Sequence, residues 1–317
     1  MNILVTGGCG FIGSNLIKFI LENKSAEVSK VVNLDSLTYA ADLRNTDDFS
    51  DHPKYCFAKI DLCDIDNLRA VIRNHKITHI IHLAAESHVD NSIKDASAFI
   101  QSNIVGTFNL LKMCMDFNIQ KFHHVSTDEV YGDLGPTGKF DEDTPYNPKN
   151  PYSASKASSD MLVRAYHHTY NMPITISNCS NNYGPNQHDE KFIPTVINCI
   201  LNNKKIPLYG SGTNIRDWIY VEDHCSAVWE VFMKGKLGET YCIGSDCEKK
   251  NIEVIEQICD IMNVQPSESI EYVKDRLGHD QRYAIDSNKI ITELGWQPST
   301  TFEKGLIKTI EWYNEKC

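Results

Sequence analysis

NILVTGGCGFIG, residues 2–13, is a short apolar run that leads directly into a glycine-rich turn. Gly7, Gly10 and Gly13 form a G-x-x-G-x-x-G pattern, which leaves room for a tight turn and for close approach of the backbone to a pyrophosphate. The amide groups and the dipole at the start of a following helix favour such an anion. Because tight turns recruit glycine for other reasons too, the pattern gains its value from what surrounds it.

Strands and helices alternate through the first half of the chain. Apolar runs predict strands at 2–6, 30–34, 54–60, 77–83, 121–126 and 174–178, with helical patterns between them at 13–23, 65–74, 96–118 and 151–170. Such alternation implies right-handed crossovers and a doubly wound parallel sheet. After about residue 180 the pattern is irregular and rich in turns. We therefore expect an α/β fold with a Rossmann-like sheet domain over 1–178, completed by segments near 216–243, and a smaller, interleaved C-terminal substrate lobe over 179–317.

Asp35 follows Gly13 by twenty-two positions, at the end of the second predicted strand. A carboxylate in this place accepts the ribose hydroxyls of NAD and repels the 2′-phosphate of NADP. Strand, glycine turn, helix, strand and carboxylate in register together predict a dinucleotide site. NAD is favoured as its cofactor, although Arg44 could reach the extra phosphate of NADP.

The composition indicates an ordinary soluble enzyme and excludes several classes of partner. The 317 residues carry a formal net charge of −11, which repels nucleic acid and anionic membranes. No apolar run reaches the roughly 20 residues of a membrane span, and the first apolar run is interpreted as a buried strand rather than a signal peptide. Eleven cysteines without a Cys-x-x-Cys pair fit a reduced cytoplasm. His79 and His82 lie in an apolar run without nearby partners, so we expect no metal site.

Tyr152 and Lys156 form Tyr-x-x-x-Lys at the start of a predicted helix, a spacing that puts both side chains on one face. A free tyrosine has a pKa of about 10, too high for a base at neutral pH. A neighbouring ammonium and the positive nicotinamide ring of NAD both favour the phenolate. Alone, this spacing is usually a surface tyrosine beside a solvated lysine. Downstream of a dinucleotide pattern, it predicts a hydride-transfer pair.

The predicted strand at 121–126 ends in Thr127-Asp128-Glu129. Ligands of open parallel sheets bind at the carboxyl ends of the strands, so this triplet is placed for chemistry. Two adjacent carboxyl groups exceed what a simple dehydrogenase needs. The alternative role for Thr127 or Asp128 is capping of a following helix.

Several segments together resemble the nucleotide-sugar branch of the extended short-chain dehydrogenase/reductase family, and most closely its hexose 4,6-dehydratases. The resemblance spans nearly the whole chain and includes LAAESHVD at 83–90, STDEVYG at 126–132, the Tyr152/Lys156 segment, NCSNNYGP at 178–185, RDW at 216–218 and GHD at 278–280. The Thr-Asp-Glu triplet discriminates, because related epimerases share the glycines and the Tyr/Lys pair but lack the acid pair.

The resemblance implies a lyase that uses NAD to convert dTDP-glucose to dTDP-4-keto-6-deoxy-glucose. In that reaction Tyr152 removes the C4 hydroxyl proton and Thr127 hydrogen-bonds the same oxygen, while hydride leaves C4 for NAD. Glu129 then takes the C5 proton as general base, and a protonated Asp128 gives a proton to the departing C6 hydroxyl. Hydride returns at C6, so the reaction is redox-neutral overall. Lys156 supports Tyr152.

The same resemblance implies two sets of binding residues. Those expected around NAD are Gly7, Gly10, Phe11, Ile12, Gly13, Asp35, Ser36, Thr38, Asp61, Leu62, Leu83, Ala84, Ala85, Ser87, Tyr152, Lys156 and Asn182. Those expected around the sugar nucleotide are Ser87, Thr127, Asn181, Lys191, Phe192, Pro207, Tyr209, Arg216, Asn251, Arg276 and His279. Arg216 is a phosphate candidate on chemical grounds as well, since its guanidinium can clamp a pyrophosphate with two hydrogen bonds.

Three positions depart from the family pattern and leave alternatives open. Asn91 and Gln281 stand where arginine is frequent, and Leu277 replaces a common proline. These changes leave dTDP against UDP as the nucleotide undecided, so a UDP-glucose 4,6-dehydratase is one alternative. A UDP-hexose 4-epimerase is another, in which Asp128 and Glu129 would be idle. A cofactor-binding regulatory protein without turnover is the third.

Family members of this type are commonly homodimers that join through two helices of each subunit. The resemblance therefore implies a homodimer formed by the predicted helices at 96–118 and 151–170, although their apolar residues could all be used against the sheet. Rhamnose biosynthesis is the common destination of the product.

Overall fold

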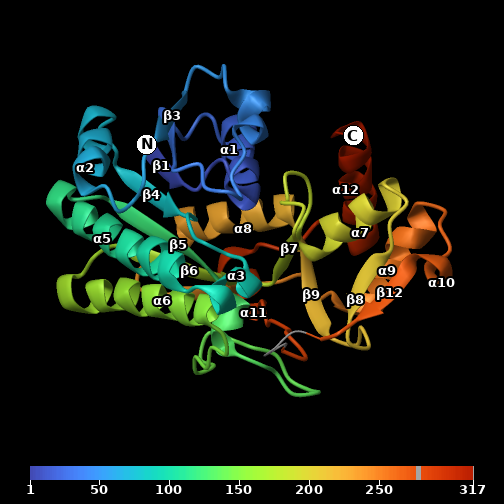
Figure 1. Ribbon diagram of the computed structural model, residues 1–317. Helices are drawn as coiled ribbons and strands as arrows, with labels where there is room; N and C mark the ends of the chain where they lie inside the picture. The colour runs from blue at the N-terminus through green and yellow to red at the C-terminus, as the bar shows by residue number, and fades with distance from the viewer. Residues whose placement is uncertain (276–279, 317) are drawn as a thin grey trace.

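A seven-stranded parallel sheet forms the centre of the larger domain (Figure 1). The computed structural model describes residues 1–275 and 280–316. The strand order is β10-β6-β5-β4-β1-β2-β3, and every neighbouring pair runs parallel. The strands are β1 Asn2–Thr6, β2 Lys30–Asp35, β3 Tyr55–Lys59, β4 His79–His82, β5 Lys121–Thr127, β6 Ile174–Cys179 and β10 Thr240–Ile243. The predicted α/β fold with a doubly wound sheet is confirmed.

Helices cover both faces of the sheet, which explains why the central strands are apolar throughout. Ile3, Leu4 and Val5 of β1 are all fully buried, as expected for a parallel strand covered on two sides. One face carries α1 Phe11–Asn23, α8 Val221–Lys234 and α11 Asn288–Leu294. The other carries α2 Ile65–Asn74, α5 Gly106–Phe117 and α6 Pro151–Tyr170. Short helical segments connect these layers: η1 Leu43–Phe49, α3 Val89–Lys94 and η3 Asp128–Tyr131.

The helix predicted over 96–118 has a change of hydrogen-bonding pattern inside it. It consists of α4 Ser97–Phe99, a π-helical segment η2 Ile100–Val105, and α5. A π segment widens the helix by one residue per turn, and such segments often occur at functional sites. Here it turns Asn103 inward, where its side chain is buried.

The smaller lobe contains two small sheets and several helices (Figure 1, right). Its three-stranded sheet has the order β11-β9-β7, and β12 pairs with β8 in a second, two-stranded sheet. The strands are β7 Asn181–Tyr183, β8 Ile206–Tyr209, β9 Ile215–Tyr220, β11 Glu248–Lys250 and β12 Ile270–Val273. The helices are α7 Phe192–Leu201, α9 Asn251–Ile261, α10 Pro266–Ser269 and α12 Phe302–Lys316.

The two parts of the fold are interleaved along the chain. Of the segment near 216–243, β9 belongs to the small sheet, whereas α8 packs on the large sheet and β10 joins it at the edge. The lobe has its own core, in which Tyr183, Trp218 and Phe302 pack together. Within the described residues, we find no helix with the length and apolar character needed to cross a membrane.

Candidate active site

A cavity of about 490 Å³ opens where the carboxyl ends of the central strands face the smaller lobe. This is the edge of a parallel sheet at which ligands bind. Every residue expected around NAD lines this cavity, and so do Thr127, Asp128 and Glu129. The expected cofactor set and the expected catalytic set therefore share one space.

The glycine turn has no room for side chains. Gly7 has a φ of +73°, and a Cβ on it would lie 2.8 Å from the backbone of Ala84. A Cβ on Gly13 would lie 2.1 Å from the carbonyl oxygen of Gly7. Gly10 precedes α1 and gives that helix no side-chain cap, so the first amide groups of α1 are available to an anion. The turn fits the pyrophosphate of a dinucleotide.

Asp35 is fixed at the end of β2 by the turn itself. Its Oδ2 accepts a hydrogen bond from Cys9 N at 2.9 Å, and its Oδ1 accepts one from Leu37 N at 2.8 Å. Burial raises the pKa of Asp35, and these two hydrogen bonds oppose the rise. Each oxygen keeps acceptor capacity for a ribose hydroxyl. Arg44 is paired with Asp42, Nη2 to Oδ2 at 2.6 Å, and is not among the residues that line the cavity.

The start of α6 places the hydride-transfer pair. Asn150 caps the helix by accepting a hydrogen bond from Ser153 N at 2.9 Å, Ser153 Oγ accepts one from Asn150 N at 3.2 Å, and Pro151 is well suited to the first turn. Tyr152 and Lys156 follow on the buried face and both line the cavity. Lys156 Nζ donates to the carbonyl oxygen of Val125 at 2.8 Å.

Burial dominates the electrostatic surroundings of Tyr152. Burial raises its pKa well above the usual value, and the charge of Glu129 raises it further. The hydrogen bond with Thr127 opposes this rise. Burial thus favours the phenol, and a positive charge near Tyr152, from Lys156 or from the ring of a bound cofactor, would favour the phenolate.

The triplet at the end of β5 both caps η3 and faces the cavity. Thr127 Oγ1 accepts a hydrogen bond from Glu129 N at 3.3 Å, so the capping role considered for Thr127 is present. The same hydroxyl donates to Asp128 Oδ1 at 3.3 Å. Asp128 is 2% exposed, and its Oδ2 has no hydrogen-bond partner among the described residues.

The two adjacent carboxyl groups have different neighbours. Burial raises the pKa of Asp128 well above its usual range, and the charges of Glu129 and Asp217 add to this. Burial also raises the pKa of Glu129, but Lys191 and Arg216 oppose the rise. Asp128 is therefore suited to remain a neutral acid, and Glu129 to act as a base.

The residues expected around the sugar nucleotide divide into four groups. Ser87, Thr127, Asn181 and Lys191 line the cavity, and Lys191 Nζ donates to Ser87 O at 2.8 Å. Arg216 on β9 affects both carboxyl groups by its charge, while its Nη2 donates to Asp280 O at 2.9 Å and its guanidinium covers the Tyr283 ring at 4.4 Å. Phe192, Pro207, Tyr209 and Asn251 belong to the lobe but not to the cavity lining. Arg276 and His279 lie outside the described residues.

Comparisons with known proteins agree with this geometry. A family model described as GDP-mannose 4,6 dehydratase matches residues 4–309. A dTDP-glucose 4,6-dehydratase of Haemophilus influenzae is 47% identical, over 99% of this chain and 98% of that protein. The chain belongs to the dTDP-glucose 4,6-dehydratase family. The predicted family is thereby confirmed.

Solved structures of this dehydratase family have the same fold. The dTDP-glucose 4,6-dehydratase of Bacillus anthracis, in complex with NAD, is 46% identical with a TM-score of 0.91, covering 99% of this chain and 97% of that one. The dTDP-glucose 4,6-dehydratase DesIV of Streptomyces venezuelae, with NAD and TYD bound, is 42% identical with a TM-score of 0.96 and the same coverage.

The sequence did not identify two buried residues, Asn103 and Asp160, which contact residues that line the cavity of this dehydratase-family protein. Asn103 binds the loop after β4: its Oδ1 accepts from Glu86 N at 2.8 Å, and its Nδ2 donates to Glu86 O at 3.0 Å and to Ser155 Oγ at 2.8 Å. Nothing in a helical sequence pattern marks this residue, because the π segment turns it inward. Asp160 was also missed, although its spacing from Lys156 could have identified it.

Glu190, which lines the cavity, contacts side chains from both parts of the fold. Tyr39 Oη, from the segment after β2, donates to Glu190 Oε1 at 3.1 Å, and Glu190 precedes α7. His88 Nε2 and His188 Nδ1 each lie 3.7 Å from a carboxylate oxygen of Glu190. Glu190 and His188 both line the cavity. The sheet domain and the lobe are thus joined beside the cavity that the expected NAD residues line.

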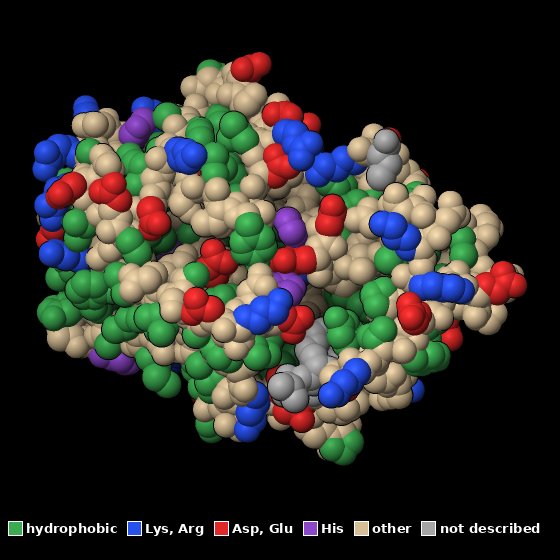
Figure 2. Space-filling view, viewed as in Figure 1, with side chains coloured by type: hydrophobic (Ala, Val, Ile, Leu, Met, Phe, Trp, Pro, Cys, Tyr) green, Lys and Arg blue, Asp and Glu red, His purple; other side chains and the backbone are tan. Residues whose placement is uncertain are grey.

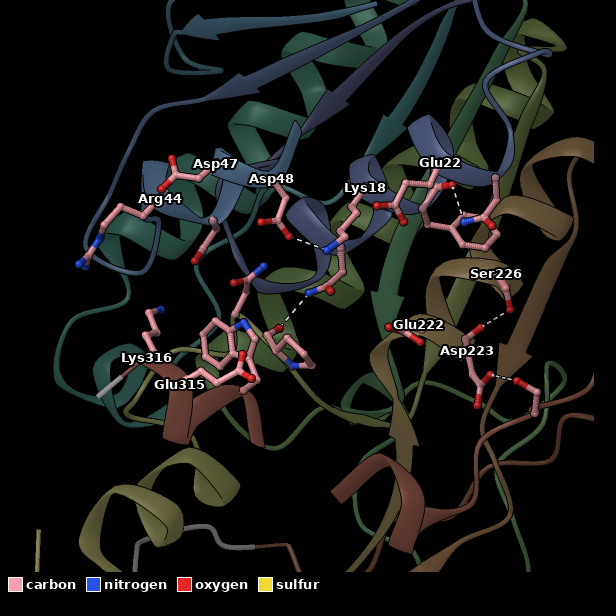
Figure 3. Close-up of a pocket in the computed structure, with 18 residues that line it drawn as sticks. Lys18, Glu22, Arg44, Asp47, Asp48, Glu222, Asp223, Ser226, Glu315 and Lys316 are labelled. Carbon is pink, nitrogen blue, oxygen red and sulfur yellow. Dashed lines mark hydrogen bonds and ion pairs between the residues drawn. The ribbon is translucent and has the colours of Figure 1, made fainter. Parts of the chain in front are cut away.

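A larger cavity of about 730 Å³ lies elsewhere, among α1, η1, α8 and α12 (Figure 3). None of the expected site residues of a dehydratase lines it. Its acidic groups are partly paired: Lys18 Nζ lies 2.5 Å from Asp48 Oδ2, and Asp223 Oδ1 accepts from Ser299 Oγ at 2.7 Å. Despite its size, it has no acid–base arrangement like that at the end of β5. In the described chain, we find no group of three or more His, Cys, Asp or Glu placed to hold a metal ion.

Proposed function

We propose that this protein is an NAD-dependent hydro-lyase that converts dTDP-glucose to dTDP-4-keto-6-deoxy-glucose. One observation carries the proposal: the buried Thr127-Asp128-Glu129 triplet lies in the same cavity as Tyr152 and a turn shaped for a dinucleotide. The relatives with this name support the choice of substrate, and their structures with NAD support the cofactor.

The first stage oxidises C4 of the hexose. NAD, when bound, accepts a hydride from C4 and returns it at C6. Tyr152 Oη takes the proton of the C4 hydroxyl, and Thr127 Oγ1 hydrogen-bonds the same oxygen. Both side chains are buried in a cavity from which the ligands displace water, so the proton transfer occurs in surroundings of low polarity.

The second stage removes water across C5 and C6. The 4-ketone acidifies the C5–H bond, and Glu129 takes that proton. Asp128 gives its proton to the C6 hydroxyl, which leaves as water, and a C5=C6 double bond forms. When hydride returns at C6, Glu129 gives its proton back to C5. The different pKa shifts of the two carboxyl groups suit these opposite roles.

The two parts of the chain divide the ligands between them. The sheet domain, 1–178, binds NAD, and the lobe, 179–317, binds mainly the sugar nucleotide. Lys191 and Arg216 hold the diphosphate, because both bring positive charge to the cavity edge. Ser87, Asn181, Phe192, Pro207, Tyr209, Asn251, Arg276 and His279 complete the substrate site.

The test uses purified protein without added NAD and dTDP-glucose labelled with deuterium at C4. We expect the product to lose one water and to carry the deuterium at C6, as measured by mass spectrometry and NMR. UDP-glucose in a parallel reaction decides the nucleotide preference. A product of unchanged mass with inverted C4 would instead identify a 4-epimerase, and Glu129→Gln would then spare activity. No change with NAD supplied would contradict catalysis and favour a regulatory protein.

We also propose that two copies associate through α5, α6 and the residues before α5. Ile100, Phe108, Met115, Met161 and Tyr170 are each between 41% and 58% exposed. Hydrophobic side chains gather over these helices on the lower left of Figure 2. A surface of this kind is typical of an interface with another protein. Light scattering should give the mass of a dimer, and Met161→Glu should give that of a monomer.

We infer that the protein works in the cytoplasm, where NAD and nucleotide sugars are supplied. Its product suits rhamnose biosynthesis, because the 4-ketone activates the ring for further change at C3 and C5. Deletion of the gene should remove 6-deoxyhexoses from cell-surface sugars, and unchanged sugar composition would contradict this destination.

A further inference from the structure

A buried carboxylate lies behind the hydride-transfer pair. Tyr152, Lys156 and Asp160 follow one another at intervals of four residues along α6, so they share one face of that helix. This face is turned toward β5 and β6, and Asp160 is 0% exposed. A charge at this depth requires partners, because burial of an unpaired ion costs several kcal/mol.

Three side chains hold the Asp160 carboxylate. His124 Nε2 lies 3.0 Å from Oδ1, and both Ser126 Oγ and Tyr146 Oη donate to Oδ2 at 2.8 Å. Arg164 Nη2 donates to Tyr146 Oη at 3.0 Å, which places a cation behind the phenol. Hydrogen bonds of this kind stabilise the ionised form of a carboxyl group.

The charges in this cluster can be assigned. His124 is neutral, because burial lowers its pKa and the charge of Lys156 lowers it further, although Asp160 opposes both. Its Nδ1 has no partner among the described residues, which fits a ring protonated at Nε2 alone. Burial would raise the pKa of Asp160, but His124, Lys156 and Ser126 outweigh it, and the pKa is lowered. Asp160 is therefore an anion.

The negative charge of Asp160 favours the ammonium form of Lys156. Lys156 is 5% exposed, and its ammonium donates a hydrogen bond to Val125 O at 2.8 Å. Burial lowers the pKa of Lys156, and Asp160 is the strongest group that opposes the fall. Without a counter-charge, a lysine in this position would favour the neutral amine, which could not stabilise a phenolate on Tyr152.

We propose that Asp160 is a positioning residue that keeps Lys156 in its ammonium form beneath Tyr152. The inference rests on the proposed function, in which Tyr152 loses and regains a proton in each turnover. Asp160 is not among the residues that line the cavity. It acts through Lys156, and it extends the functional spacing of α6 to Tyr-x-x-x-Lys-x-x-x-Asp.

Other titratable groups face the cluster but carry no charge near neutral pH. Burial raises the pKa of Cys179, beside Lys156, to about 12. Burial lowers the pKa of His82, whose ring lies 5.2 Å from that of His124, well below its usual range. Burial also raises the pKa of Tyr146 beyond the physiological range. Asp160, Lys156 and Arg164 are thus the charged members of the cluster.

The experiment measures the charge of Lys156 directly in the NAD-loaded protein. Lysine labelled with ¹³C at Cε reports loss of the ammonium proton by its chemical shift, and Lys156→Arg assigns the signal. Asp160→Asn keeps the size of the side chain and its acceptor for Ser126 and Tyr146 but removes the charge. We expect the wild-type signal at pH 7 to be that of an ammonium, and the D160N signal to titrate at lower pH than the wild-type signal.

Kinetics give a second readout. Raising the pH above 7 should lower kcat of D160N at least about tenfold more than it lowers kcat of wild type, while KM for dTDP-glucose changes less than about threefold. Asp223→Asn is the matched control, since Asp223 is a buried carboxylate held by Ser299 Oγ and Thr300 N, away from the site. D223N should lose stability but keep the wild-type pH profile.

Two results would overturn the proposal. One is a neutral-amine signal for wild-type Lys156 at pH 7, which decides the matter even where D160N does not fold. The other is an unchanged Lys156 titration in folded D160N. Neither result depends on turnover, so a protein that failed to dehydrate dTDP-glucose would still give an interpretable signal for Lys156.

Discussion

Replacement of the proposed acid by its amide, Asp128→Asn, separates the two stages of the reaction. Asn keeps the shape of the side chain and can accept the hydrogen bond that Thr127 Oγ1 donates to Oδ1 at 3.3 Å. It has no acidic proton for the C6 hydroxyl. C4 oxidation requires only Tyr152, Thr127 and the cofactor, so this step should proceed.

The size of the effect follows from burial. Asp128 is 2% exposed, so bulk water has little access to replace it as acid. General acid catalysis contributes about 10²- to 10⁴-fold, or roughly 3–5 kcal/mol of barrier, and we expect a loss toward the upper end in the elimination step. Wild-type kcat should also fall as pH rises through the raised pKa of Asp128, because the protonated form is the active one.

The assay is a single turnover followed by absorbance at 340 nm, which reports the reduced cofactor, together with quenched samples for mass spectrometry. D128N should accumulate the reduced cofactor and the 4-ketone and form little dehydrated product. Asp141→Asn, an exposed change outside the cavity, should behave as wild type. Equal slowing of oxidation and elimination in D128N, or no slowing of elimination, would refute the assignment of Asp128 as the acid.

Three further changes test the cofactor cradle, its closure and a buried charge. Gly13→Ala puts a Cβ 2.1 Å from Gly7 O, so the variant should lose its NAD during gel filtration. Gly135→Ala, whose Cβ would have nothing within 4 Å, should keep its NAD. Equal NAD content in the two variants would contradict the role of the glycine turn in NAD binding. Glu190→Gln weakens the contacts to Tyr39 and His88 and should speed NAD release several-fold, as measured by stopped-flow fluorescence. An unchanged release rate would show that these contacts do not retain NAD. Burial raises the pKa of Asp217 from 3.8 to about 6, so its stabilising contribution is complete below about pH 4 and lost as pH rises through about 6. Between these pH values, chemical denaturation should show the free energy of unfolding of wild type falling by up to about 3 kcal/mol relative to that of Asp217→Asn. Parallel curves of unfolding free energy against pH for the two proteins would contradict the raised pKa.

Local features of the chain were predictable because neighbouring residues decide them. The glycine turn, Asp35 and the start of α6 are each fixed by contacts within a short segment or between adjacent strands. Alternation of apolar runs and helices gave the sheet domain for the same reason. Arg44 pairs with Asp42, two positions away, and this contact is also local. The sequence alone did not decide between this ion pair and a contact of Arg44 with the 2′-phosphate of NADP.

Features that depend on distant partners were not predictable. β8 pairs with β12 although more than fifty residues separate them. The pattern of apolar residues in a strand does not identify the strand with which it pairs. The π segment that turns Asn103 inward differs from an α-helix by one residue in its hydrogen bonds, which periodicity does not detect. The hydrogen bond of the Lys156 ammonium to Val125 O joins α6 to β5 across 31 positions of the chain, and the spacing of Tyr152 and Lys156 does not reveal it.

The proposed acid and base roles of Asp128 and Glu129 rest on the different surroundings that the fold gives to two adjacent carboxyl groups. In the sequence, both are carboxylates at the end of a strand. In the fold, Asp128 is buried, and the charges of Glu129 and Asp217 favour its proton, while Arg216 and Thr127 oppose them. Glu129 is partly exposed to the cavity and faces Lys191 and Arg216, two cations from the lobe. In the proposed mechanism, burial at the end of β5 favours the proton of Asp128, and the two cations of the lobe favour the ionised form of Glu129, so both parts of the fold are needed.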